Sequence, residues 1–322
     1  MKRVAVLGAG AWGTSIATVL AERLDVTLWA RDPSHAEALA RSRRNQRYLP
    51  GIAIPQAVKV TPAFPGADLF LAATPVAGLR EVVQRIGKQA PLVWLCKGFE
   101  HGTGLLPHQV VEQVLGPGAR CGALSGPSFA DEVARGLPCA LTLASRDAAF
   151  AREAAALVHG GRMRVYYSAD LVGVEVGGAV KNVMAIAAGI SDGLGLGHNA
   201  RAALITRGLA EIARLGAAMG GKSETIFGLT GAGDLILTAT GELSRNRRVG
   251  LQLAEGIPLQ EILKNLGHVA EGVYTAQEVA KLAEARGVDM PVTAAVNDVL
   301  QGKLTPKAAV EQLLARDLKP ER

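Results

Sequence analysis

Aromatic, cysteine and histidine residues are scarce in this sequence, and each scarcity narrows the class of protein. Aromatic residues make up 4% of the 322 residues and hydrophobic residues 49%, so the core has to be built from aliphatic and small side chains. The three cysteines, Cys96, Cys121 and Cys139, all fall inside predicted strands. An odd number of buried cysteines indicates free thiols in a reducing compartment. The six histidines have no metal-ligand spacing relative to Cys, Asp or Glu, and we predict no metal site.

Long basic runs and membrane-length apolar runs are also scarce. No stretch of arginine and lysine is interleaved with aromatic residues, so the net charge of +6 favours an anionic small molecule over nucleic acid as the ligand. The first apolar run is too short for a signal peptide and lacks a small-residue cleavage pattern, so we expect no leader. Only the segment 171–191 approaches the length of a membrane span.

A glycine-rich motif follows the first predicted strand. Residues 2–7 form a short β-rich run, and a helical pattern covers residues 14–22. Between them stands G-x-G-x-x-G, in the order of strand, turn and helix that dinucleotide binding requires. Gly8 permits the tight turn, Gly10 lets the backbone approach a pyrophosphate, and Gly13 lets the helix pack close to the strand. The helix start then faces the phosphates. The alternative is a glycine-rich turn without a ligand.

The end of the second predicted strand bears on the choice of cofactor. Residues 25–30 form this strand, and Arg31 and Asp32 follow it. NAD-preferring folds place an acid here to bind the ribose hydroxyls, whereas an arginine can pair with a 2′-phosphate. Because Arg31 comes first, we expect NADPH to be accepted, with NADH as a possible second cofactor. The alternative for Arg31 is a solvated arginine in a turn.

Further apolar segments alternate with helical patterns and predict a parallel, doubly wound sheet. The predicted strands cover residues 68–73, 91–96, 120–124, 138–144 and 162–167. Polar residues follow three of them, at Thr74, Lys97 and Ser125–Ser128. Because ligands bind at the carboxyl ends of strands in such sheets, Lys97 and Ser128 are placed to meet one. The alternatives are a surface lysine for Lys97 and a helix cap for Ser128.

The apolar segment 171–191 contains one lysine, Lys181, in its middle. The segment reads as a buried helix, and burying an ammonium is costly without a partner. Burial also lowers a lysine pKa, which makes Lys181 usable as a general base near neutral pH. We expect Gly177 and Gly178, one turn earlier, to leave room for a ligand, and Asn182 to offer hydrogen bonds. The alternatives are a lysine snorkelling from a core helix or a membrane span.

Beyond residue 167 the strand pattern gives way to helical periodicity. We therefore predict a dinucleotide-binding Rossmann domain over residues 1–169 and an all-helical substrate domain over residues 170–322. Predicted helices cover residues 201–219, 251–254, 275–286, 291–300 and 306–315.

Two loops of the helical half carry candidate ligand-binding groups. A glycine-rich turn, 228–234, ends in Asp234, which could bind a substrate hydroxyl, the use that we favour, or pair with a nearby cation. Residues 244–248 open a helix with serine at the N-cap, a typical anion site. There we favour ligand binding for Arg245 and Asn246, and a solvated face for Arg247 and Arg248.

Together these stretches resemble the NAD(P)-dependent glycerol-3-phosphate dehydrogenase family of bacterial type, over nearly the whole chain. The motifs that carry the resemblance are GAGAWGT (8–14), LWARD (28–32), CKG (96–98), LSGPSFADEVA (124–134), GVEVGGAVKNVMAIAAGI (173–190), GLTGAGDLILTATGELSRNRRVG (228–250) and VAEGV (269–273). The resemblance implies a cytoplasmic enzyme, usually dimeric. It would reduce dihydroxyacetone phosphate to sn-glycerol 3-phosphate with NAD(P)H and so feed glycerophospholipid synthesis.

The resemblance also implies roles for single residues, with Lys181 as the proton donor and acceptor. The implied substrate-binding residues are Lys97, Gly126, Ser128, Lys181, Asp234, Ser244, Arg245 and Asn246. The cofactor site, including the motif glycines, would contain Gly8, Gly10, Trp12, Gly13, Thr14, Arg31, His35, Tyr48, Lys97, Ala130, Arg245, Val269 and Glu271.

Two other functions fit parts of the sequence. A related two-domain dehydrogenase acting on a hydroxy acid would need a carboxylate clamp where we predict a phosphate site. A dinucleotide-sensing protein without turnover would not need proton-transferring groups such as Lys97, Lys181 and Asp234 in ligand-facing positions.

Overall fold

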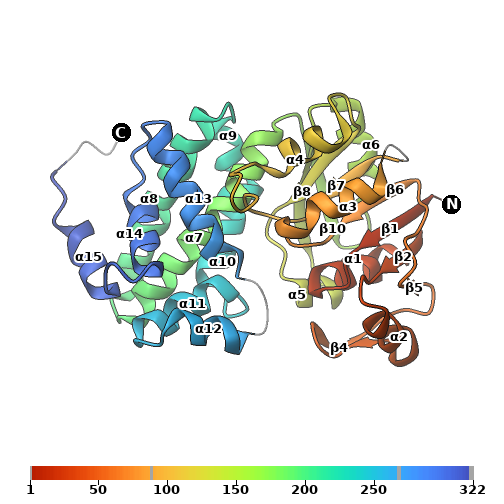
Figure 1. Cartoon of the computed structure of the whole chain (residues 1–322), viewed down its shortest axis with the longest axis horizontal. Helices are drawn as coiled ribbons and strands as arrows, with labels where there is room; N and C mark the ends of the chain where they lie inside the picture. Colours follow the sequence, from red (N-terminus) through yellow and green to blue (C-terminus); the bar gives the residue numbers. More distant parts are fainter. Residues whose placement is uncertain (1, 88–89, 267–269, 319–322) are drawn as a thin grey trace. The chain divides into compact units, whose positions relative to one another are not determined.

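The computed structural model describes residues 2–87, 90–266 and 270–318. The chain divides into two compact units (Figure 1). The first contains Met1–Glu100 and Leu105–Glu175, and the second contains His101–Gly104 and Val176–Arg322. The division falls inside a helix, slightly beyond the predicted boundary between residues 169 and 170. The short segment His101–Gly104 groups with the second unit, which the sequence did not indicate.

The first unit is built on a sheet that is eight-stranded in the described part of the chain. The strand order is β10-β9-β8-β7-β6-β1-β2-β5. Its first six members in chain order follow the doubly wound order of dinucleotide-binding folds, with the reversal between β1 and β6. This confirms the predicted fold class. The strands are β1 (Arg3–Leu7), β2 (Asp25–Trp29), β5 (Lys59–Thr61), β6 (Leu69–Ala72), β7 (Leu92–Trp94), β8 (Cys121–Ser125), β9 (Cys139–Ala144) and β10 (Met163–Ser168).

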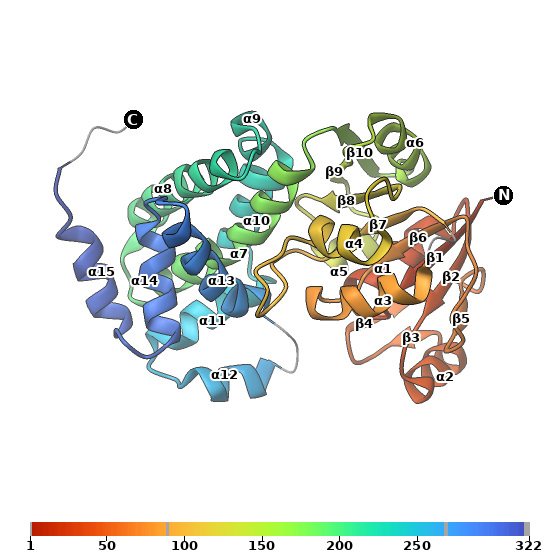
Figure 2. The same cartoon turned by 45° about the horizontal axis from the view of Figure 1, so that its top comes forward.

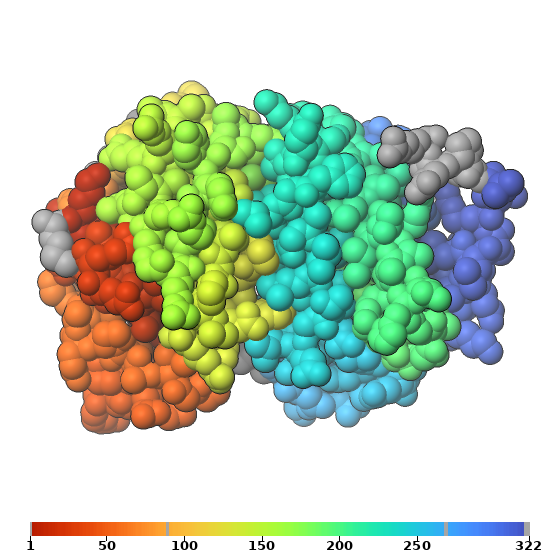
Figure 3. Space-filling model, turned by 180° about the vertical axis from the view of Figure 1, so that it is seen from behind, coloured from red at the N-terminus to blue at the C-terminus, as the bar shows by residue number. Residues whose placement is uncertain are grey.

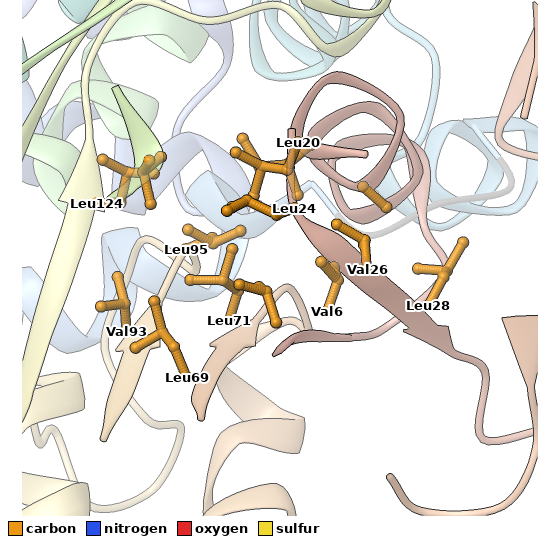
Figure 4. Packing of buried hydrophobic residues seen from close by; sticks show 14 of the residues in the cluster. Val6, Leu20, Leu24, Val26, Leu28, Leu69, Leu71, Val93, Leu95 and Leu124 are labelled. Carbon is orange, nitrogen blue, oxygen red and sulfur yellow. The ribbon is translucent and has the colours of Figure 1, made fainter. Parts of the chain in front are cut away.

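Helices cover both faces of this sheet, because both faces of its central strands are apolar. In β1, Val4 and Val6 face one core cluster and Ala5 and Leu7 face the other, as the two-residue repeat of a strand requires. Figure 4 shows the first cluster, in which Leu20 and Leu24 lie over Val6, Val26 and Leu71. The helices are α1 (Ala11–Leu20), α2 (Pro33–Ser42), the 3₁₀ helix η1 (Val76–Gly78), α3 (Leu79–Ile86), α4 (Pro107–Leu115), α5 (Ala130–Ala134) and α6 (Ala148–Val158).

The sheet is not parallel throughout, which corrects the prediction. Strand β9 pairs antiparallel with β8 and parallel with β10. The only helix between β8 and β9 is α5, which has five residues. A helix of that length spans roughly 7.5 Å, too little to bring the chain back to the starting edge of a parallel neighbour. Instead α5 packs against α1. In the view from behind, the red surface of the N-terminal residues borders yellow-green surface of the same unit (Figure 3).

Some local features of this unit also differ from the prediction. Cys96 lies in the loop after β7 and not inside a strand, while Cys121 and Cys139 lie in strands as predicted. A small antiparallel sheet of β3 (Arg44–Asn45) and β4 (Leu49–Ala53) was not predicted. Strands this short carry too few residues for a recognisable two-residue repeat.

The second unit is helical in its described residues and is organised around α7 (Figure 2). This helix runs from Leu171 to Gly193, without a proline to interrupt it. By length and composition α7 could span a membrane, but 94% of its apolar window is buried, as in the core helix of a globular protein. The remaining elements are α8 (Gly197–Ala218), α9 (Ser223–Ile226), the π-helical turn η2 (Leu229–Gly233), α10 (Asp234–Thr240), α11 (Arg245–Ala254), α12 (Leu259–Leu266), α13 (Glu271–Ala285), α14 (Pro291–Leu300) and α15 (Pro306–Leu314).

Candidate active site

Each of the three motif positions after β1 is occupied by glycine for a different physical reason. Gly8 has φ +118°, and a Cβ there would lie 2.8 Å from the carbonyl oxygen of Ala73 at the end of β6. A Cβ on Gly13 would lie 1.9 Å from the carbonyl oxygen of Gly8, so only glycine lets α1 pack this close to the turn. A Cβ on Gly10 would meet no atom within 4 Å. The backbone at Gly10 is therefore bare and open on the side where a ligand could approach.

The turn leads directly into α1, whose first amides have no intrahelical acceptor. Gly10 is the N-cap residue, and Trp12 lies half-buried in the first turn. No acidic side chain lies in that turn, so the helix dipole and the amides present a positive end. Together with the open backbone at Gly10, this end fits the pyrophosphate of a dinucleotide.

His35 and Tyr48 lie at the glycine-rich turn, although they follow it by many residues. The Nε2 atom of His35 lies 3.3 Å from the carbonyl oxygen of Ala9, and the ring of His35 packs edge-on against Tyr48 at 5.5 Å. Thr14 is fully buried, and its hydroxyl accepts a hydrogen bond from Asn45 at 2.7 Å. The sequence did not point to Asn45, because a lone asparagine outside the predicted strands and helices has no distinguishing signal.

Arg31 and Asp32 divide two tasks at the end of β2. Asp32 caps α2 by accepting a hydrogen bond from the amide of Ser34 at 3.0 Å. The Arg31 side chain is 73% exposed and pairs with Glu81 at 3.4 Å. Exposed pairs of this kind contribute little free energy, so Arg31 can exchange Glu81 for an anionic ligand at small cost.

The ends of β7 and β8 bring together three of the predicted substrate residues. Lys97 Nζ donates to the carbonyl oxygen of Gly126 at 3.1 Å, and Ser128 Oγ donates to the same oxygen at 3.0 Å. Gly126 has φ +139°, in the region that favours glycine. The N-cap of α5 is Phe129, so Ser128 is not the helix cap that was one alternative. Ala130, a predicted cofactor residue, is the first residue of α5.

Lys181 lies at the centre of a buried polar cluster in the second unit. Its Nζ donates to Asp234 Oδ1 at 2.7 Å and to Thr238 Oγ1 at 2.7 Å. The side chains of Lys181 and Asp234 are only 8% and 3% exposed. Desolvation disfavours the charged ammonium, and the adjacent carboxylate favours it. The cluster therefore holds the Lys181 ammonium in a fixed position, and Asp234 is paired with a cation, which is the less favoured of its two predicted uses.

Thr238 was missed by the sequence analysis. It lies one helical turn beyond Asp234 on α10, and its hydroxyl also donates to the carbonyl oxygen of Asp234 at 2.6 Å. Residues four apart share a helix face. The i, i+4 spacing would have singled out Thr238 if a helix had been predicted over residues 234–240, but the sequence analysis assigned Asp234 to the end of a glycine-rich turn and predicted no helix after it.

The prediction that Gly177 leaves room for a ligand is wrong. A Cβ on Gly177 would lie 3.2 Å from the carbonyl oxygen of Thr230 and 3.3 Å from Gly231. The missing side chain is used for close packing between α7 and the π-helical turn η2. That segment was predicted only as a glycine-rich turn, but it forms a regular π-helical turn, with the amide of Gly233 donating to the carbonyl oxygen of Gly228 at 3.1 Å.

A chain of carboxamides links α7, α11 and α13. Asn246 Nδ2 donates to Asn182 Oδ1 at 2.9 Å, and Asn246 Oδ1 accepts from the amide of Gly272 at 3.1 Å. Glu271, a predicted cofactor residue, begins α13 beside this chain. Both oxygen and nitrogen of the Asn246 carboxamide are thus engaged, which fixes its orientation.

The start of α11 matches the prediction for Ser244 and contradicts it for Arg247. Ser244 is the N-cap, and its hydroxyl accepts from the amide of Arg247 at 3.2 Å. Arg245 and Arg248 are exposed. Arg247 was expected on a solvated face, but its side chain is 16% exposed and its Nη2 lies 2.6 Å from Asp192 Oδ2. The partner, at the end of α7, is too distant in sequence for the local pattern to reveal.

A buried acid on α7, Glu175, belongs to the first unit. Its carboxylate accepts a hydrogen bond from the amide of His108 at 2.9 Å and contacts the His108 ring. Burial raises the pKa of Glu175, and the contacts with His108 oppose this rise. Burial, with a smaller effect from Glu175, also raises the pKa of the Cys121 thiol to about 12, so this thiol stays protonated and unreactive at neutral pH.

Two further predictions concern Val269 and the absence of a metal site. Val269 lies outside the described residues. Within residues 2–87, 90–266 and 270–318, no three His, Cys, Asp or Glu side chains gather as metal ligands.

The first unit has a doubly wound sheet with a glycine-rich turn, and the second unit is helical with a buried lysine–carboxylate pair. This combination is typical of two-domain dinucleotide-dependent oxidoreductases. Family comparison is more specific. Residues 3–151 match the model of the NAD-dependent glycerol-3-phosphate dehydrogenase N-terminus, and residues 170–311 match that of its C-terminus. The chain belongs to the NAD-dependent glycerol-3-phosphate dehydrogenase family, which confirms the resemblance.

Individual relatives agree with this assignment over the full length. The glycerol-3-phosphate dehydrogenase [NAD(P)+] of Dechloromonas aromatica is 59% identical over 99% of both chains. That of Aromatoleum aromaticum is 57% identical over 99% of this chain and 100% of its own. The crystal structure of glycerol-3-phosphate dehydrogenase from Coxiella burnetii has a TM-score of 0.92 at 42% identity, covering 98% of this chain and 99% of that one.

Proposed function

We propose that this chain reduces dihydroxyacetone phosphate reversibly to sn-glycerol 3-phosphate, with NADPH or NADH as the reductant. The observation that carries this proposal is the buried cluster of Lys181, Asp234 and Thr238, in a chain of the glycerol-3-phosphate dehydrogenase family. A proton donor held at a fixed position is what carbonyl reduction requires of the protein.

The first unit binds the dinucleotide through backbone groups. The open face of Gly10 and the amides at the start of α1 receive the pyrophosphate. Arg31, which is exposed and paired with Glu81, pairs instead with the 2′-phosphate of NADPH. When bound, the reduced nicotinamide supplies the hydride that the carbonyl carbon takes up.

Lys181 moves the proton. As the carbonyl oxygen gains negative charge, the Lys181 ammonium gives it a proton and becomes a neutral amine, which regains a proton from solvent. In the reverse direction the neutral amine removes the hydroxyl proton. Asp234 and Thr238, each 2.7 Å from Nζ, hold the lysine in one rotamer, which keeps the distance to the reacting oxygen fixed.

The substrate phosphate binds at the start of α11. Arg245 is exposed there, and the helix amides and dipole favour an anion. Ser244 and Asn246 shape this helix start, because one caps the helix and the other fixes α11 to α7. Lys97 and Ser128, both on the carbonyl of Gly126, bind the remaining polar groups of the substrate.

We also propose a location, an oligomeric state and a cellular role. The enzyme acts in the cytoplasm as a homodimer, and its product feeds glycerophospholipid synthesis. Among the described residues one apolar helix, α7, has membrane length, and 94% of its apolar window is buried, which supports a protein that acts outside the bilayer. Sedimentation velocity over a range of protein concentrations measures the dimer directly; a single monomer boundary would contradict it.

The proposed function is tested by the decrease in NADPH absorbance on adding a substrate to the purified protein. We expect turnover with dihydroxyacetone phosphate and at most trace turnover with 2-ketoacids. Preferred consumption of a 2-ketoacid would make the protein a hydroxy-acid dehydrogenase. Binding of NADPH without consumption by folded protein would make it a dinucleotide sensor.

A further inference from the structure

Asn45 is a fully buried polar residue, and its whole carboxamide is engaged at the glycine-rich turn. Its Nδ2 donates to the carbonyl oxygen of Ala9 at 3.0 Å and to Thr14 Oγ1 at 2.7 Å. Its Oδ1 accepts from the amide of Tyr48 at 3.3 Å. A carboxamide has two N–H donors, and here each has one partner. Three contacts therefore fix the orientation of Asn45.

The two acceptors of Asn45 lie on either side of the backbone that would bind the pyrophosphate. Ala9 immediately precedes Gly10, and Thr14 immediately follows Gly13. Asn45 thus connects the turn with the first turn of α1 and spans Gly10–Gly13. The amides of this stretch are those that a helix start offers to an anion.

The contact with Ala9 also determines the direction of one of these amides. A trans peptide is planar, so the N–H of Gly10 points away from the carbonyl of Ala9. Asn45 holds that carbonyl toward the protein interior, which directs the Gly10 N–H to the opposite side. On Gly10 a Cβ would meet no atom within 4 Å, so the backbone is uncovered there. His35 Nε2, at 3.3 Å from the same carbonyl, adds a second, longer contact.

We propose that Asn45 is a positioning residue for the cofactor, which holds the peptide of Ala9 and Gly10 and the start of α1 in the geometry that binds a dinucleotide pyrophosphate. The inference rests on the proposed function, because it requires that the turn binds NADPH. Asn45 touches the protein backbone and Thr14, and it acts on the cofactor through them. Its replacement is therefore expected to change cofactor affinity and leave the proton-transfer step unchanged.

The test measures NADPH binding and turnover in Asn45→Ala, with Ser145→Ala as a matched control. Ser145 is also a buried hydrogen-bonding residue of the first unit, donating to the carbonyl oxygen of Cys121 at 2.6 Å, but it lies directly after β9 and not in β3. NADPH fluorescence titration gives Kd, and initial rates with dihydroxyacetone phosphate give KM and kcat. For Asn45→Ala we expect Kd and KM for NADPH to rise roughly tenfold, with kcat at saturation within about twofold of wild type. Ser145→Ala should keep the wild-type Kd.

Thr14→Val provides a second variant that keeps the side-chain shape and removes only the hydroxyl. It should weaken NADPH binding, and combining it with Asn45→Ala should add little, because both remove the same link. An unchanged Kd in folded Asn45→Ala or Thr14→Val, or an equal loss in Ser145→Ala, would overturn the inference. Failure of the wild-type protein itself to bind NADPH would instead contradict the proposed function.

Discussion

The glycine-rich turn of the first unit and the lysine cluster of the second unit use different chemical groups for different purposes. The turn uses neutral backbone, and its defining residues, Gly8, Gly10 and Gly13, act by what they lack. The cluster uses charged side chains, with Lys181 and Asp234 both almost fully buried. Backbone amides bind an anion without an added charge to desolvate, whereas a buried ammonium needs its carboxylate to remain.

This difference separates binding from chemistry. Changes at the turn should alter the affinity for the cofactor, while changes at the cluster should alter the rate of proton transfer or the stability of the helical unit. Five substitutions test this separation, starting with the largest expected effect.

Replacing Lys181 should have the largest effect on rate. Without the proton donor, kcat of Lys181→Ala should fall roughly 10²–10⁴-fold, measured as initial rates with dihydroxyacetone phosphate and NADPH. Lys303→Ala is the control, since Lys303 lies 62% exposed in an ion pair with Asp298, and it should retain wild-type kcat. Near wild-type turnover in folded Lys181→Ala would remove Lys181 from the mechanism.

Replacing Asp234 should have the largest effect on stability. Asp234→Asn keeps the shape of the side chain but leaves the buried ammonium without its countercharge, so the free energy of unfolding should fall by about 3–5 kcal/mol. Urea denaturation of the helical signal measures this. Asp298→Asn, which breaks a surface pair, should cost at most about 1 kcal/mol. Equal losses of unfolding free energy in the two variants would mean that burial of the Lys181–Asp234 pair does not determine its contribution to stability.

Two alanine substitutions separate the roles of the motif glycines. In Gly13→Ala the new Cβ would lie 1.9 Å from a carbonyl oxygen, so α1 has to shift and stability should fall by about 1–3 kcal/mol. In Gly10→Ala the new Cβ meets nothing, so stability should be retained while the Kd for NADPH rises roughly tenfold through loss of close approach. Thermal denaturation and NADPH titration on both variants decide the matter; a retained NADPH affinity in Gly10→Ala would argue against the pyrophosphate site.

Arg31→Ala should have the smallest effect, on selectivity between cofactors. Loss of the guanidinium should weaken NADPH by roughly five- to tenfold relative to NADH, because only NADPH carries the 2′-phosphate. The ratio of kcat/KM values for the two cofactors reports this. The same ratio in wild type and variant would leave Arg31 as the exposed turn residue of the alternative interpretation.

The two regions also differ in how much their sequences revealed. The turn follows from local rules, because a strand, three spaced glycines and a helix are adjacent in the chain. The first and last residues of most predicted strands agree closely with the structure for the same reason. The antiparallel direction of β9 was missed, since it depends on the short connection through α5 and on packing against α1, which no local period contains.

In the helical unit, the sequence identified Lys181 as a candidate functional residue but did not identify most of the residues around it. Thr238, the burial of Arg247 against Asp192, and the filling of the space beside Gly177 by η2 all depend on contacts between elements far apart in the chain. Asn45 is a similar case in the first unit. Buried polar partners are chosen by tertiary structure, so one sequence shows that Lys181 needs a partner but does not show which residue it is.

The most direct test of the separation between binding and chemistry is an NADPH titration of folded Lys181→Ala, set beside its rate of turnover. The account predicts that Kd stays within about twofold of wild type while kcat falls at least 100-fold. A Kd that weakens in step with kcat would show that Lys181 serves cofactor binding, and would contradict the assignment of proton transfer to the buried cluster.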